Sequence, residues 1–144
     1  MIMRIGVISD LHYGMDPELD TSKEKALKSM LKCLDSLILC GDNAELFQGL
    51  HFHNRLFAFL RKTAGIPMAF VLGNHDLFGH IMRRGVSYNE LASKLDQFSD
   101  LAKSYDLIHL EREDLMIGSF TIIGTYGHYD GSLSGDKFKE DSKT

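Results

Sequence analysis

The sequence lacks several features that mark membrane, secreted or nucleic-acid-binding proteins. Its 144 residues contain no apolar run of about 18 residues and no charged segment leading into an apolar one. We therefore expect neither a membrane span nor a signal peptide, and we expect a cytoplasmic protein. The formal net charge is -4 and the 16 basic residues form no block, so nucleic acid is a disfavoured partner.

Cysteine clusters and phosphate-binding glycine motifs are also missing. Cys33 and Cys40 form no Cys-x-x-Cys pair, which disfavours a zinc cluster and favours reduced side chains packed in the core. Neither a Gly-x4-Gly-Lys-Ser/Thr loop nor a Gly-x-Gly-x-x-Gly fingerprint occurs, which argues against nucleotide binding by those routes. There are no internal repeats. A composition of 44% hydrophobic and 25% charged residues fits one globular domain with an adequate core.

Short apolar runs alternate with helical patterns through the first hundred residues. Residues 3–9, 36–40 and 67–72 are typical of buried strands, and helices are expected over 22–34, 44–63 and from the capping box at 87–90 to about 104. Three strand-like runs follow at 107–110, 114–118 and 120–125, where we expect a hairpin. This alternation predicts an α/β fold, with a mostly parallel sheet and flanking helices.

Polar side chains follow each of the first three predicted strands. They occur in Asp10-Leu11-His12, in Gly41-Asp42-Asn43 and in Gly73-Asn74-His75-Asp76. Because parallel strands end at the same edge of a sheet, we expect these side chains to converge. Oxygen and imidazole donors without thiolates suit Mn, Fe, Zn or Mg, and a carboxylate such as Asp42 can bridge two such ions.

The three motifs together resemble the calcineurin-like metallophosphoesterase superfamily, whose signature begins Asp-x-His, Gly-Asp and Gly-Asn-His-Asp/Glu at similar intervals. The resemblance implies the N-terminal half of a four-layer α/β/β/α sandwich. It also implies a phosphomonoesterase or phosphodiesterase that uses metal-bound hydroxide and two divalent ions, with Mn, Fe and Zn as candidates. Its substrate would be a phosphoester small molecule or a nucleotide-like compound.

The resemblance also implies a role for each residue of the motifs. Asp10 and His12 would bind the first metal, Asp42 would bridge both ions, and Asn74 would bind the second. His75 would be the acid that assists the leaving group, and Asp76 would orient His75.

The later ligands of the superfamily have no counterpart in this chain. Relatives continue with a further His and a Gly-His-x-His motif, whereas only His80, His109 and His128 follow His75, and His109 is expected in the core. The second metal would keep only Asp42 and Asn74, so we expect weak binding there. We assign residues 1–131 to a partial domain and 132–144 to a disordered polar tail, and we interpret the chain as a truncated, split or partial product.

Three functions follow as alternatives. The first is the metal-dependent phosphoester hydrolase, and the second is an inactive remnant or half-domain that binds metal weakly or pairs with a missing C-terminal part. A nuclease subunit is the third, and a homo-oligomer is a further candidate assembly. His51 and His53 lie two apart on a predicted helix, so they should point to different faces and lie at a surface or interface.

Overall fold

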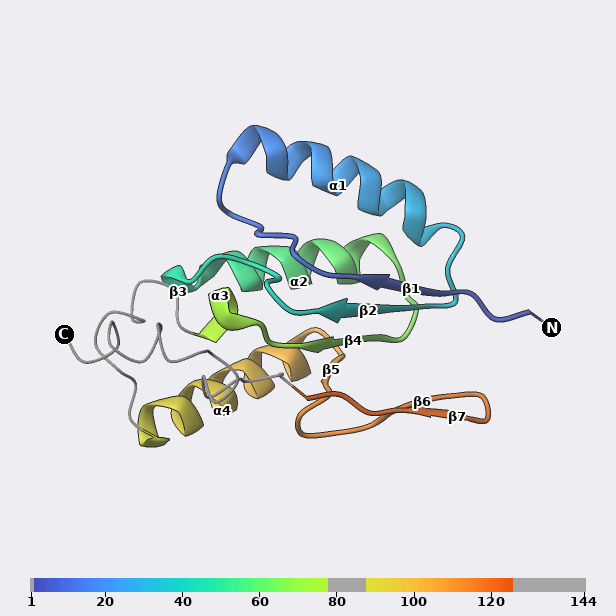
Figure 1. The fold of residues 1–144 in the computed structure, drawn as a ribbon. Coiled ribbons are helices and arrows are strands. Elements are labelled where there is room, and N and C mark those ends of the chain that lie inside the picture. The colour runs from blue at the N-terminus through green and yellow to red at the C-terminus, as the bar shows by residue number, and fades with distance from the viewer. Residues whose placement is uncertain (1, 78–87, 126–144) are drawn as a thin grey trace, which may run out of the picture.

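Four parallel strands form the central sheet of the protein. The computed structural model describes residues 2–77 and 88–125 of the chain. Within these ranges the strand order is β1-β2-β4-β5 (Figure 1). The strands are β1 Ile5–Ile8, β2 Ser36–Cys40, β4 Met68–Val71 and β5 Leu107–His109. The mostly parallel sheet predicted from the alternating pattern is confirmed.

Helices connect the strands of this sheet. They are α1 Pro17–Leu31, α2 His51–Thr63, the short α3 Asn74–Leu77 and α4 Tyr88–Ser104, and β3 Phe47–Leu50 precedes α2. After the sheet, β6 Leu115–Ile117 and β7 Phe120–Ile122 pair as an antiparallel hairpin. Both α4 and the hairpin lie where the sequence predicted them.

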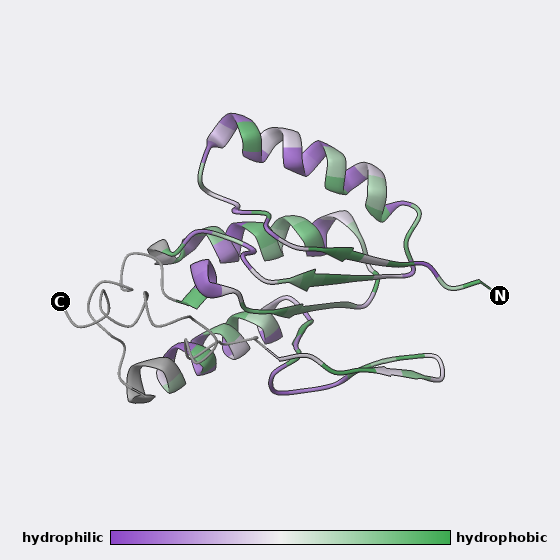
Figure 2. Ribbon diagram, in the orientation of Figure 1, coloured by the Kyte–Doolittle hydropathy of each residue, from purple (hydrophilic) through white to green (hydrophobic). Residues whose placement is uncertain are grey.

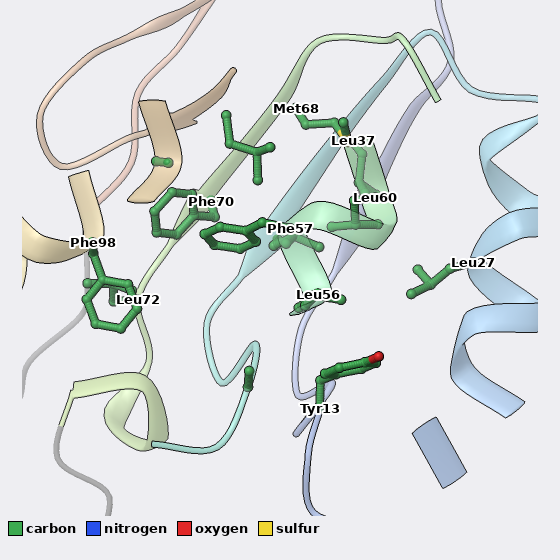
Figure 3. Packing of buried hydrophobic residues seen from close by; sticks show 14 of the residues in the cluster. Tyr13, Leu27, Leu37, Leu56, Phe57, Leu60, Met68, Phe70, Leu72 and Phe98 are labelled. Atoms are coloured by element: carbon green, nitrogen blue, oxygen red, sulfur yellow. The ribbon is translucent and has the colours of Figure 1, made fainter. Parts of the chain in front are cut away.

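The two faces of the sheet are covered differently. Leu37 of β2 and Phe70 of β4 face the three long helices, in a core that also contains Leu27, Leu31, Leu56, Phe57, Leu60, Phe98 and Ala102. Figure 3 shows Phe57 beside Phe70 there, and their ring centroids are 5.0 Å apart. Because side chains alternate along a strand, Ile38 and Ala69 face the other way, where Leu110, Leu115 and Ile117 cover them.

Helix α1 begins earlier than the predicted start at residue 22. Asp16 caps it by accepting hydrogen bonds from the backbone N–H groups of Glu18 (2.8 Å) and Leu19 (3.1 Å), and Pro17 occupies the first turn. Thr21 bonds the carbonyl of Pro17 rather than capping. The sequence signal for the observed start is therefore Asp16-Pro17, which precedes the capping-box pattern in the chain.

Helix α2 begins at His51, so the prediction of a helix from residue 44 was wrong. Ala44 forms a parallel β-bridge with Tyr13, and the N–H of Glu45 donates to the carbonyl of Tyr13 at 2.9 Å. Gly49 has a left-handed φ of 59°. Pairing with a distant segment thus holds residues 44 and 45 in an extended path, although their local composition favours a helix.

The first strand is not the fully buried strand that its sequence predicted. β1 is an edge strand of the described sheet, and the side chains of Ile5 and Val7 are 37% and 63% exposed. Figure 2 shows that this strand is apolar. Among the described elements, the helices cover one face of β1, and the hairpin covers β2 and β4 on the other face of the sheet. Cys33 and Cys40 are likewise exposed, which contradicts the predicted core packing.

Some sequence predictions lie outside the described residues. They are those on His80, His128 and the tail at 132–144. Among the residues that the structure does describe, no helix is both long enough and apolar enough to cross a membrane.

Candidate metal centre

The loops that follow β1 and β2 run side by side at the carboxyl edge of the sheet. The N–H of Asp10 donates to the carbonyl of Gly41 at 3.1 Å, and the N–H of His12 donates to the carbonyl of Asp42 at 2.9 Å. In Figure 1 this edge lies on the left, beside α3. Parallel pairing therefore continues past the strands and sets the register of the two polar motifs.

This pairing brings three predicted metal ligands together. Ligand atoms of Asp10, His12 and Asp42 all lie within 4.8 Å of one another. Asp10 is exposed, whereas His12 and Asp42 are half-buried, so an ion would sit in a shallow site open to solvent. The convergence expected from sequence is therefore present in the fold.

These three residues also share an unusual backbone conformation. Asp10, His12 and Asp42 have φ angles of 56°, 43° and 50°, in the left-handed region that non-glycine residues seldom adopt. A residue held there costs on the order of 1–3 kcal/mol, and such strain concentrates at ligand sites. Among the described non-glycine residues only Asp106 shares it, at the far end of the sheet. The strain is thus concentrated where the ligands meet.

Gly73 brings the third polar motif against Asp42. A Cβ atom at Gly73 would lie 2.1 Å from Oδ1 and 2.3 Å from the backbone nitrogen of Asp42. The N–H of His75 donates to the same Oδ1 at 2.9 Å. Only glycine permits this approach, which fixes one oxygen of Asp42 against the start of α3.

Asn74 and His75 begin α3 at this edge. Asn74 is exposed and His75 is half-buried. The rings of His75 and His12 meet edge to face with centroids 4.6 Å apart. His75 therefore lies beside His12 of the first motif, and Asn74 precedes it at the exposed start of the helix.

Glu45 belongs to the site, and sequence reasoning missed it. Its side chain is only 2% exposed, and its Oε1 lies 2.8 Å from Nδ1 of His12 and 3.4 Å from Nδ1 of His75. Ligand atoms of these three residues also lie within 4.8 Å of one another. The available signal was a carboxylate three residues after Asp42, which the predicted helix had obscured.

Asp76 contacts groups other than the ring it was expected to orient. Its buried carboxylate accepts hydrogen bonds from the backbone of Asn43, Ala44 and Gly73. It also lies 2.7 Å from Nε2 of His53. The side chains of Asp76 and His53 are both 0% exposed. The surface or interfacial position expected for His53 was therefore wrong.

The residue after His12 also has a distinctive environment. The hydroxyl of the buried Tyr13 donates to Glu24, and the guanidinium of Arg55 lies 5.5 Å from the Tyr13 ring centroid. Burial, followed by the hydrogen bond to Glu24, raises the pKa of Tyr13 from 10.0 to about 12. Tyr13 thus stays neutral across the physiological range and anchors the loop that holds His12.

The sequence of the chain matches a known protein family. The family model for calcineurin-like phosphoesterases matches residues 3–143, which includes all of the strands and helices described above. No curated protein matches the chain significantly.

Proposed function

Because the chain belongs to the calcineurin-like phosphoesterase family of metal-dependent phosphoester hydrolases, we propose that it cleaves phosphomonoesters or phosphodiesters at the carboxyl edge of its sheet. The observation that supports this most directly is the convergence of Asp10, His12 and Asp42 within 4.8 Å. Their strained backbone conformations support it independently, because a fold that needed only turns there could use unstrained residues.

The donor set fits a divalent metal ion. Two carboxylates and an imidazole, with no thiolate, suit manganese, iron or zinc. We propose that Asp10, His12 and Asp42 hold a first ion and that Asp42 and Asn74 hold a second. When bound, such ions polarise a phosphoryl oxygen and activate water for attack.

His75 is the proposed general acid. Its Nδ1 faces Glu45 at 3.4 Å, which leaves Nε2 as the nitrogen available to a leaving-group oxygen. Glu45 would hold the ring in place, while the bond from the backbone N–H of His75 to Asp42 connects the acid to the ligand loop. The proposed roles of Glu45 and His75 thus follow from one set of contacts.

The test combines metal content with catalysis. Purified chain should contain manganese by mass spectrometry after loading, and it should cleave bis-p-nitrophenyl phosphate in a manganese-dependent reaction. Asp42→Asn should lose both properties. Asp106→Asn is a matched control, because Asp106 also has a left-handed φ, of 50°, but lies beside Arg61 at the opposite edge of the sheet. A wild-type chain that binds no metal and cleaves nothing would refute the proposal.

Exposure of β1 favours a second candidate function, that of an inactive half-domain. Ile5 and Val7 leave an apolar strip exposed. Among the described residues, Asn74 and the shared Asp42 are the only ligands that we propose for the second ion. A polypeptide that covered β1 and supplied histidines would complete both features. This candidate predicts a chain that alone binds at most one ion weakly and gains cleavage only with that partner. If the chain is a monomer in sedimentation equilibrium and is fully active, this candidate is excluded. If the active chain is a homodimer, the partner is a second copy of the chain.

A further inference from the structure

The carboxylate of Asp76 joins three separate segments inside the protein. Oδ1 accepts from the N–H groups of Asn43 (2.9 Å) and Ala44 (3.1 Å), in the loop after β2. Oδ2 accepts from the N–H of Gly73 (2.8 Å), in the loop after β4. The third segment is α2, from which Nε2 of His53 approaches Oδ1 at 2.7 Å. One carboxylate therefore connects both loops to a helix.

His53 can serve this carboxylate only as a donor. An ionised carboxylate accepts hydrogen bonds and cannot donate them, so Nε2 of His53 carries the proton. Nδ1 of His53 is buried, and no residue in the described part of the chain forms a hydrogen bond with it. The ring packs edge to face against Phe98, with centroids 4.8 Å apart. Apart from this packing, the bond to Asp76 is the one polar contact that the described residues give His53.

A histidine at this buried position lowers the stability of the fold relative to an apolar residue. A buried polar atom without a partner destabilises the fold, and a leucine would pack against Phe98 without that loss. What histidine supplies beyond packing is the hydrogen bond to Asp76. The residues that Asp76 holds, Asn43 and Gly73, are the immediate neighbours of Asp42 and Asn74.

From these contacts we propose that His53 and Asp76 form a buried clamp that holds the two metal-ligand loops in their binding geometry. His53 is then a positioning residue. It would act on a bound ion through Asp76 and the ligand loops, without contacting the ion itself. This inference rests on the proposed function only in identifying Asp42 and Asn74 as ligands. The effect of the clamp on the two loops does not depend on a bound metal, so it can be tested in metal-free protein.

Two variants separate hydrogen bonding from packing. His53→Leu keeps an apolar side chain against Phe98 but removes the donor, whereas His53→Gln keeps a donor of similar reach. In His53→Leu, hydrogen exchange at the Gly73 and Ala44 amides of metal-free protein should become about tenfold faster. Manganese affinity should fall by about 10- to 100-fold, the usual effect of losing a group that supports a ligand. His53→Gln should stay within about threefold of wild type in both measurements.

A third variant controls for general loss of stability. Leu56→Ala removes a fully buried side chain from the same helix and should destabilise the whole fold. Because local opening at Gly73 and Ala44 does not require global unfolding, these amides should exchange at their wild-type rates while core amides of β2 exchange faster. Manganese affinity should be unchanged. The clamp predicts that only His53→Leu changes these two quantities.

The outcomes decide the proposal separately from catalysis. Unchanged exchange at Gly73 and Ala44 in His53→Leu would overturn the clamp, as would equal losses in His53→Gln and His53→Leu. If His53→Leu does not fold, wild-type exchange in His53→Gln supports the clamp and faster local exchange overturns it. A wild-type chain without phosphoesterase activity would refute the proposed function but leave the exchange result to decide the clamp.

Discussion

Gly73 and Asp42 lie so close together that the space beside Gly73 cannot hold even a methyl group. A Cβ atom there would be 2.1 Å from Oδ1 of Asp42, a side chain that the structure brings beside Asp10 and His12. The closeness of the two loops explains why the third polar motif must begin with glycine. It also makes the position of Asp42 sensitive to a change outside the ligand set.

Gly73→Ala should therefore displace Asp42 and weaken metal binding. Overpacking of this kind costs about 1–3 kcal/mol, and we expect manganese affinity to fall at least tenfold in isothermal titration calorimetry. Gly65→Ala is the control, because a Cβ atom at Gly65 would meet nothing within 4 Å. Equal affinities of the two variants would contradict the close contact seen here.

Glu45→Gln should impair both histidines that face Glu45. Loss of the charge beside Nδ1 of His12 and His75 should reduce kcat by about 10- to 100-fold with a smaller loss of manganese affinity. Steady-state kinetics with bis-p-nitrophenyl phosphate at saturating manganese would separate the two effects. The exposed Glu113 provides the control substitution, Glu113→Gln. A Glu45→Gln variant with wild-type kcat would remove Glu45 from the proposed mechanism.

Stability should decline at high pH because of Tyr13. Its pKa is raised to about 12 in the folded protein from 10.0, so the folded state retains a proton that the unfolded state releases between these values. The resulting stabilisation is complete below pH 10 and is lost as the pH rises through 12. Urea denaturation from pH 9 to pH 12 should show this decline in wild type and a shallower one in Tyr13→Phe. Tyr105, whose hydroxyl donates to Asn54, gives the control Tyr105→Phe, which should decline as wild type does.

Removing the cap of α1 should destabilise the fold without changing the metal site. Asp16→Ala loses the two bonds to Glu18 and Leu19 and should lower the free energy of unfolding by about 1 kcal/mol in urea denaturation. Ser29→Ala, at an exposed position of the same helix, should have little effect. An Asp16→Ala variant as stable as Ser29→Ala would show that the cap contributes nothing measurable.

Local sequence patterns were sufficient to predict the parallel sheet and the convergence of Asp10, His12 and Asp42. Short apolar runs are typical of strands in a parallel sheet, and parallel strands place their carboxyl ends at one edge. The three loops meet because β1, β2 and β4 are neighbours in the sheet. That convergence therefore depends on topology more than on side-chain detail.

Only the tertiary structure decided the surroundings of those ligands. Pairing of Ala44 with Tyr13 delays the start of α2, which places Glu45 against two histidines and His53 against Asp76. Likewise, Val7 is exposed because no described element packs over its side of β1. The amino-acid composition of β1 does not indicate this. Hydrophobic periodicity specifies an element and its apolar face, but the partners of a buried polar group come from segments distant in sequence.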